Sequence, residues 1–464
     1  MTVVMIKDFR RIFLCGVYNT SQMPSRFTAA TLVFLTALPV LAQQPPQYDL
    51  LLQGGHVIDA KNNISAIRDV AIRDGKIAAV SPKIDPALAL KSVNLNGLYV
   101  TPGIVDIHFH SYTGTGEKNS YAGDLSILPD GFTFRTGVTT VADAGCSGWR
   151  NFEDFKQRVI DRSKTRILVF LNIVGNGMRQ GRFESDLTDM EVKPATEMAL
   201  KYKDLIIGVK TAHFPGPEWT PVENAVAVGT AANIPVMVDF GSNRPERPLE
   251  QLLGTKLRPG DIYTHCFSGL RNELGTNGKL NPALAQGRKR GIFFDVGQGG
   301  GSLAYPVAME AMKEKFLPDS ISTDLHTASM NSGTKDMLNL MSEFLAMGRS
   351  VDEVVARATW NPAREIHQES LGNLSVGAPA DIAVLNLRDG KFGFADMYGA
   401  RLSGAKRFEC ELTLRNGKVV YDLNALARPA WETLPPDYRR QGDPRWDAIS
   451  PGRGPGRAST PRVP

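Results

Sequence analysis

The feature that most constrains the fold is a series of apolar segments that alternate with amphipathic ones between residues 101 and 373. Several of the apolar segments contain hardly any polar residue, and such strands are typical of a parallel sheet covered by helices on both faces. Helical patterns lie between them, for example at 152–164 and 302–315. We predict eight strands, at residues 103–109, 137–143, 166–173, 205–211, 234–240, 261–266, 291–295 and 320–324. Eight such units predict an α/β fold, a (β/α)8 TIM barrel, rather than an open doubly wound sheet.

Short strand patterns flank this region on both sides. Residues 48–100 contain apolar runs separated by turn signals, and Asp74-Gly75 between two of them is typical of a hairpin, because glycine adopts positive φ at little cost. The same pattern returns between 380 and 421, where Asn416-Gly417 is the turn signal. We therefore predict a small β-sandwich domain formed from both chain ends, residues 43–100 and 374–426, beside a barrel of residues 101–373.

The two termini predict segments outside these domains. Arg26 precedes an apolar run at 29–41 that ends in a small-residue cleavage site, which is typical of a signal peptide over residues 1–42. Met23 is an alternative start. The run is shorter than the ~20 apolar residues that span a bilayer, so we expect cleavage rather than an anchor, and a periplasmic or secreted protein. The tail at 427–464 is rich in Pro, Gly and Arg and predicts disorder.

Charge and cysteine content exclude two classes of protein. The formal net charge is +5, and residues 1–42 contribute three of these charges, so the folded body is close to neutral. A nucleic-acid-binding protein would carry a basic stripe on that body. Cleavage would leave Cys146, Cys266 and Cys410, and this odd, widely spaced set is no disulfide framework.

The histidines gather where a barrel places its catalytic groups. His56 and His367 lie away from the predicted strand ends, and we expect both to be structural. The other five lie at or just after the C-terminal ends of predicted barrel strands, which form the catalytic rim of this fold: His108, His110, His213, His265 and His326.

His108 and His110 give the strongest signal for a metal site. They lie two positions apart in a predicted strand, where residues i and i+2 point to the same side, so both imidazoles face the barrel interior and can share one cation. Imidazole is a good ligand for zinc and similar divalent metals.

These motifs resemble the amidohydrolase superfamily over roughly residues 48–425. Residues 102–110 are similar to the first barrel strand of that family and 137–141 to its second, while 361–363 with 377–382 resemble the exit into its small β domain. Within the superfamily the chain resembles the dihydroorotase-like deacetylases and D-aminoacylase-related hydrolases. The resemblance implies a metal-dependent hydrolase of carbon–nitrogen bonds other than peptide bonds.

The resemblance also implies a set of metal ligands. His108 and His110 would hold the more buried metal. Lys210 falls where the family has a carboxylated lysine that bridges two metals, and apolar neighbours favour the neutral amine that a carbamate requires. His265 matches the ligand of the sixth strand. Asp324 matches the carboxylate of the eighth strand, which binds a metal and accepts a proton from the reacting water.

One position departs from the family pattern, because the fifth strand ends in Asp239 where the family has a histidine ligand to the second metal. A carboxylate binds Zn²⁺, Mn²⁺ or Mg²⁺, so Asp239 is either a ligand with an altered metal preference or a residue that holds a water or a substrate amine beside a single metal. The expected cofactors are one or two Zn²⁺ ions, with Mn²⁺ as the alternative, and a CO2-derived carbamate on Lys210.

Other residues near the rim receive smaller roles. His326, Gly299 and Gly300 are expected to bind the substrate, the glycines through backbone N–H groups of a rim loop. His213 is more typical of a loop residue than of a ligand. Cys146 is more typical of a small packed thiol, although relatives of the D-aminoacylase kind place a metal-binding cysteine nearby.

The implied reaction is hydrolysis of an amide or ester bond of an N-acyl amino acid or related acylated small molecule by a metal-activated hydroxide, with Asp324 passing the proton to the leaving group. Two alternatives stay open: a cyclic-amide hydrolase of the dihydroorotase or hydantoinase type, and a non-catalytic binding protein on a decayed amidohydrolase scaffold. The expected partner is a small acylated substrate, with no nucleic acid and no stable membrane insertion after signal cleavage. A homo-oligomer is compatible with the sequence.

Overall fold

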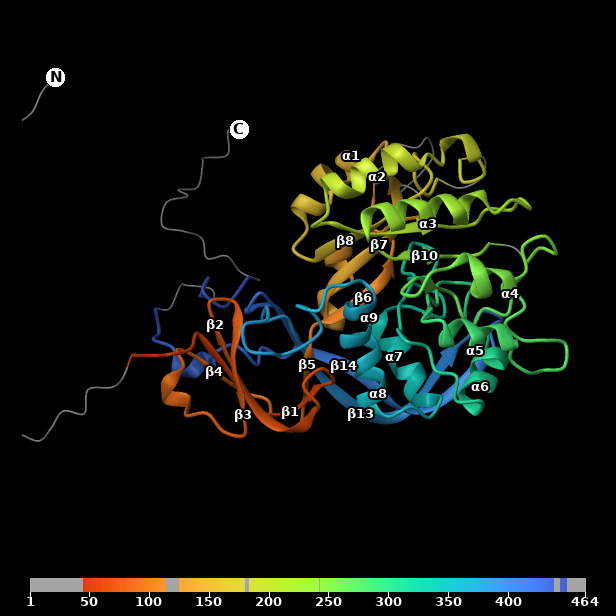
Figure 1. Ribbon diagram of the computed structural model, residues 1–464. Coiled ribbons are helices and arrows are strands. Elements are labelled where there is room, and N and C mark those ends of the chain that lie inside the picture. Colours follow the sequence, from red (N-terminus) through yellow and green to blue (C-terminus); the bar gives the residue numbers. More distant parts are fainter. Residues whose placement is uncertain (1–44, 114–124, 180–182, 242, 438–442, 449–464) are drawn as a thin grey trace, which may run out of the picture. The chain divides into compact units, whose positions relative to one another are not determined.

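The computed structural model describes residues 45–113, 125–179, 183–241, 243–437 and 443–448 (Figure 1). The predicted signal peptide, residues 1–42, lies outside these described residues. No helix among them is long and apolar enough to cross a membrane.

Seven parallel strands form a curled sheet in which each strand pairs with the next one along the chain. Nearly every residue of these strands is buried, because helices cover the outer face of the curled sheet and its inner face is enclosed within the barrel. This explains why the strands appear as continuous apolar runs in the sequence. The strands are β6 (Ile104–Phe109), β7 (Val138–Gly148), β8 (Arg166–Asn172), β9 (Ile206–Thr211), β10 (Val236–Val238), β11 (Ile262–Tyr263) and β12 (Phe293–Phe294).

The eighth predicted strand, at 320–324, does not form a regular strand. Isolated bridges join Ser320 to Asp295, just after β12, and Leu325 to Phe109 in β6, so the segment closes the barrel between its first and last strands. The hydroxyl of Ser320 also donates to the Asp295 carboxylate at 2.8 Å. The segment has a single backbone bridge to each neighbouring strand, and side-chain hydrogen bonds supplement this pairing.

Helices cover the outer face of the barrel sheet (Figure 1). For example, α2 and α3 pack against each other and against β9. The patterns predicted at 152–164 and 302–315 correspond to α1 and α6. The helices are α1 (Phe152–Arg158), α2 (Val192–Lys201), α3 (Thr220–Ala232), α4 (Leu249–Gln251), α5 (Pro282–Lys289), α6 (Tyr305–Lys313), α7 (Met337–Ala346), α8 (Val351–Ala358) and α9 (Trp360–Glu365).

A second, mixed sheet combines strands from both ends of the chain. Its order is β15-β14-β13-β5-β1-β2-β3, with β4 paired to β1, and the antiparallel pair β5–β13 joins the two ends. Both predicted turn signals lie between adjacent strands, with φ of +51° at Asp74 and +49° at Asn416. The strands are β1 (Leu50–Asp59), β2 (Ile64–Arg73), β3 (Lys76–Ser81), β4 (Ser92–Asn94), β5 (Tyr99–Pro102), β13 (Ile382–Ala395), β14 (Arg401–Arg415) and β15 (Lys418–Asp422).

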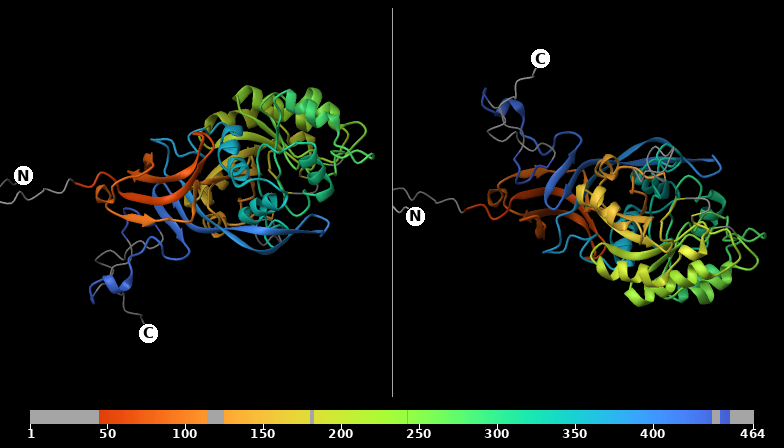
Figure 2. Two further views of the ribbon diagram at one scale, coloured as in Figure 1. Left: turned by 90° about the horizontal axis from the view of Figure 1, so that it is seen from below. Right: turned by 90° about the horizontal axis from the view of Figure 1, so that it is seen from above.

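The long β13–β14 hairpin connects this sheet to the barrel helices. Figure 2 shows the hairpin, in blue, running alongside the teal helices, and β14 packs against α7. The Phe408 amide donates to the hydroxyl of Ser342 at 2.9 Å. The small sheet and the barrel therefore share part of one hydrophobic core.

Part of the predicted tail pairs with the small sheet. The Val419 amide donates to the carbonyl of Trp446 at 2.7 Å, and the Ala448 amide donates to the carbonyl of Val419 at 2.9 Å. Residues 438–442 and 449–464, on which the prediction of disorder also rests, lie outside the described residues.

Candidate active site

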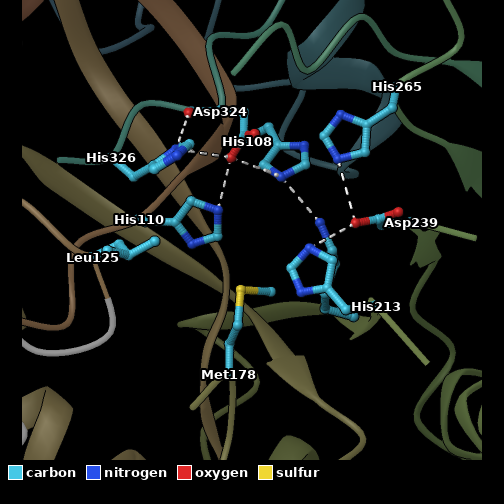
Figure 3. Close-up of a pocket in the computed structure, with 10 residues that line it drawn as sticks. His108, His110, Leu125, Met178, His213, Asp239, His265, Asp324 and His326 are labelled. Carbon is cyan, nitrogen blue, oxygen red and sulfur yellow. Dashed lines mark hydrogen bonds and ion pairs between the residues drawn. The ribbon is translucent and has the colours of Figure 1, made fainter. Parts of the chain in front are cut away.

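A cavity of about 190 Å³ lies at the C-terminal ends of the barrel strands (Figure 3). All five histidines that the sequence places at this rim line the cavity, together with the predicted ligands from the fourth, fifth and eighth strand positions. Gly299 and Gly300 are not among the lining residues, and their contact with substrate stays a prediction. The lining residues are His108, His110, Leu125, Met178, Lys210, His213, Asp239, His265, Asp324 and His326.

His108, near the end of β6, is held as a neutral ring whose Nε2 faces the cavity. Its Nδ1 lies 2.9 Å from the hydroxyl of Thr264, which donates its own proton to Asp295 at 2.7 Å. The hydroxyl must therefore accept from Nδ1–H, which leaves the lone pair of His108 on Nε2. Burial, with the charge of Lys210, lowers the pKa of His108 to about 3. A neutral imidazole is the state that binds a metal.

His110 and His265 are anchored in the same way, through Nδ1. The Nδ1 of His265 donates to the carbonyl of Gly297 at 2.6 Å, and the Nδ1 of His110 lies 3.1 Å from the sulfur of Cys146. The Nε2 of His110 lies 2.8 Å from Asp324 Oδ1. Each ring thus presents Nε2 to the interior, because the protein occupies its other nitrogen.

The thiol of Cys146 is fully buried behind His110. Burial and the carboxylate of Asp143 raise its pKa well above the usual range. The expected role of Cys146 as a packed thiol stays a prediction, because a bound metal would itself deprotonate a coordinating thiol.

Asp324 completes a group of ligand atoms. One nitrogen of His108, one of His265 and one carboxylate oxygen of Asp324 all lie within 4.8 Å of one another, and this is the one such group of three in the part of the chain that the structure describes. Burial alone would raise the pKa of Asp324, but its interactions with His108, His110 and His326 hold it well below the usual range. Neutral imidazoles and an ionised carboxylate are the donors that zinc sites use, so the residues present fit a divalent metal.

The loop after β12 approaches the ligands so closely that residue 297 has to be glycine. Its φ is +47°, and a Cβ there would lie 2.9 Å from the Nδ1 atoms of both His108 and His265. A Cβ at Gly299 would lie 2.1 Å from Asp324 Oδ2. Because glycine has no Cβ, the loop can pack directly against the side chains of His108, His265 and Asp324.

Lys210, in β9, extends into the same centre. Its side chain is fully buried, and Nζ lies 3.0 Å from His108 Nε2 and 3.7 Å from the sulfur of Met237. Burial lowers its pKa, although Asp239 and Asp324 partly oppose this effect. Both observations favour an amine that is neutral more often than an exposed lysine.

Asp239, just after β10, belongs to a chain of charged side chains. It forms a short ion pair with Arg271, and its Oδ2 lies 3.0 Å from His213 Nε2 and 3.5 Å from His265 Nε2. The other nitrogen of His213 lies 2.8 Å from Glu184. Burial by itself would lower the pKa of His213, but the two carboxylates outweigh it and raise the pKa to about 10.

Sequence reasoning did not find Arg271, Glu184 or Asp295. Arg271 and Glu184 lie in loops without a strand pattern, so no local signal connects them to the rim. Asp295 could have been identified from the sequence, because it ends an apolar run at the same rim as the histidines.

Comparison with known proteins agrees with this geometry. The family model of the amidohydrolase family matches residues 295–421. A deacetylase from Brucella anthropi is 32% identical over 343 residues, which cover 72% of this chain and 83% of that protein. Among solved structures, an adenine deaminase covers 81% of this chain and 100% of its own at 28% identity and a TM-score of 0.74. A dihydroorotase covers 80% of this chain and 99% of its own at 30% identity and a TM-score of 0.69.

A barrel with a histidine-rich rim and a buried aspartate at its last strand position defines a metal-dependent hydrolase. The chain belongs to the amidohydrolase family, and it is an enzyme that hydrolyses carbon–nitrogen bonds. The predicted superfamily and the predicted (β/α)8 fold class are both confirmed.

Proposed function

We propose that this chain is a metal-dependent deacetylase that hydrolyses the amide or ester bond of an N-acyl amino acid or a related acylated small molecule. The observation that carries the proposal is the convergence of His108, His265 and Asp324 in one buried cavity. A relative of which this chain covers 83% is named a deacetylase, which supports the reaction class.

The cavity supports a small substrate. Its volume of about 190 Å³ is below the range of ~300–1,000 Å³ that is usual for drug-sized ligands. Leu125 and Met178 form the apolar part of its lining, which suits a short acyl chain.

A divalent ion, Zn²⁺ with Mn²⁺ as the alternative, would be held by His108, His110, His265 and Asp324. When bound, such an ion lowers the pKa of water and polarises a carbonyl group. Asp324 is ionised in this environment and can accept a proton from water and deliver it to the leaving nitrogen. The Nδ1–H of His326 donates to the backbone carbonyl of Asp324 at 2.7 Å, and so the ring holds the segment that carries this carboxylate.

Lys210 is the proposed site of the carbamate. A carbamate forms when a neutral amine adds CO2, and burial of Lys210 lowers the pKa of its amine. In the described part of the chain, the hydrogen bonds of its Nζ go to His108 and Met237 and not to a carboxylate. Carbon-13 NMR of protein supplied with labelled bicarbonate tests this, and a carbamate signal that Lys210→Ala abolishes is the expected result.

Residues 1–42 support export to the periplasm or the medium. We expect mass analysis of the mature protein to give an N-terminus at Gln43.

The decisive experiment is hydrolysis by metal-loaded protein of a matched substrate panel. We expect release of the acyl group from N-acetyl amino acids, with Asp324→Asn inactive although it is folded. The panel includes dihydroorotate and hydantoins, because the structural similarity to a dihydroorotase makes cyclic amides the second candidate. Turnover of cyclic amides alone would replace the deacetylase proposal. Absence of both turnover and bound metal would leave only a binding protein on a decayed scaffold.

A further inference from the structure

We propose that the side chains of Glu184, His213, Asp239 and Arg271 form a fixed charge array in place of a second metal, so that each chain holds one divalent ion. The inference rests on the proposed function, because it assumes that the histidine centre binds a metal. It resolves the two roles that the sequence leaves open for Asp239, in favour of a residue that is not a ligand.

Protein groups already occupy both carboxylate oxygens of Asp239. Oδ1 accepts from the guanidinium of Arg271 and from the Gly241 amide at 3.2 Å. Oδ2 faces His213 Nε2 at 3.0 Å. The Asp239 side chain is 2% exposed, so it has little access to water. A metal that bound Asp239 would compete with Arg271 and His213 for the same two oxygens.

Arg271 is the partner that is hardest to displace. Its side chain is buried, its Nη1 donates to the hydroxyl of Ser268 at 3.0 Å, and its backbone amide donates to Glu273 at 2.9 Å. A guanidinium keeps its charge under all physiological conditions. Any ion bound at Asp239 would therefore lie next to a fixed positive charge in a site of low dielectric, where repulsion is strong.

His213 adds a second cation on the other side of Asp239. Its two ring nitrogens each face a carboxylate oxygen, Glu184 at 2.8 Å and Asp239 at 3.0 Å, so both nitrogens carry a proton to donate. Figure 3 shows the ring of His213 beside Asp239 at the cavity. With Arg271, the array contains two positive and two negative charges. A second metal is not needed to neutralise Asp239.

The remaining ligand atoms are directed to the other position. His108, His265 and Asp324 form one group, and Lys210 Nζ lies 3.0 Å from His108 Nε2. His265 is the residue that the two positions share, since its Nε2 also lies 3.5 Å from Asp239. Asp239 and His213 would distinguish a second site, and both are already paired with charged groups. A carbamate on Lys210 would then serve one ion rather than bridge two.

Metal stoichiometry of the full-length protein tests the proposal directly. Apo-protein is titrated with Zn²⁺ and, separately, with Co²⁺; bound metal is measured by inductively coupled plasma mass spectrometry, and the cobalt form by electron paramagnetic resonance. We expect one ion per chain and a cobalt signal without spin coupling. Two ions per chain, with coupled cobalt, would overturn the charge array. No bound ion in folded protein would overturn the proposed function instead.

Variants test whether the array excludes the second ion. Asp239→His combined with Arg271→Met restores a histidine and removes the fixed charge, and we expect occupancy to rise from one ion to two. Asp239→His alone should stay at one, because the guanidinium remains. Arg166→Met is the matched control, since it breaks a partly buried ion pair with Asp381 outside the cavity and should leave one ion bound.

Retention of the first ion shows that each variant still folds around the site. A folded double variant that keeps its first ion and gains no second one would contradict the role given to Arg271. If Arg271→Met prevents folding, Arg271→Gln, which keeps the shape but not the charge, replaces it, with the same two outcomes.

Discussion

Asp295 controls which nitrogen of His108 carries the proton, and its replacement by asparagine tests this. The Asp295 carboxylate is fully buried and accepts from the hydroxyls of Thr264 and Ser322, each at 2.7 Å, and of Ser320 at 2.8 Å. Burial alone would raise its pKa, but its interactions with His108, Ser322 and Thr264 outweigh burial and hold the pKa below the usual range. The ionised carboxylate thus fixes the direction of the Thr264 hydroxyl.

Asparagine would place a donor where one of these oxygens now accepts. If the Thr264 hydroxyl turns to accept from the new amide, it donates its own proton to His108 Nδ1. The neutral ring must then carry its proton on Nε2. A protonated Nε2 cannot bind a metal. Outer partners of metal-binding histidines typically contribute 10–100-fold to metal affinity, so we expect the Kd for Zn²⁺ to rise by roughly that factor, or about 1.4–2.7 kcal/mol.

The assay is competition for Zn²⁺ between apo-protein and a chromophoric chelator. Asp261→Asn is the control: Asp261 is equally buried, but it binds Arg258 and the Val236 amide and not a histidine. Thr264→Val removes the same connection from its other end and should weaken zinc binding in the same direction. Unchanged affinity in folded Asp295→Asn and Thr264→Val would refute the argument about the proton on His108.

Two further predictions concern the loop and the core. Gly297→Ala forces a Cβ to within 2.5 Å of the Thr264 hydroxyl at a φ of +47°. We therefore expect loss of bound metal and destabilisation by at least ~1 kcal/mol. Gly301→Ala is the control, because its Cβ meets no atom within 4 Å, and it should change neither metal content nor thermal unfolding. Glu343 is buried, and burial raises its pKa from 4.5 to about 7, so its contribution to stability is complete below the lower value and is lost as the pH rises through the higher one. Glu343→Gln should therefore reduce the loss of unfolding free energy between pH 5 and pH 8 by a few kcal/mol in urea denaturation, and an unchanged pH dependence would contradict this.

The barrel could be predicted because its strands are buried on both faces, but the lengths of the later strands could not. The segment predicted at 234–240 pairs only over Val236–Val238, and that at 261–266 only over Ile262–Tyr263. Each of these two segments stops pairing with its neighbours just before its site residue, Asp239 or His265. His265 has a φ of +60°, a conformation that tertiary contacts impose and an apolar pattern does not encode.

The gathering of the candidate ligands at one rim was predictable for a related reason. Parallel strands end at one rim, so His108, Lys210, His265 and Asp324 could be assigned to one place from their order in the sequence. His213 has a φ of +57° in a loop, and its partner Glu184 lies on another loop. Contacts between loops depend on how each loop folds over the barrel, and sequence spacing does not determine that.

Asp239 shows why a single departure from a family pattern is not interpretable alone. A buried carboxylate without a partner costs several kcal/mol, so an aspartate at this position needs hydrogen-bond donors or cations beside it. The structure contains two, Arg271 and His213, and the second is itself held by Glu184. If Asp239 bound a metal, these cations would be a liability, since they would compete with that metal for the same oxygens. Their presence makes position 239 one member of a set of four, and the chemistry of the site follows from the set.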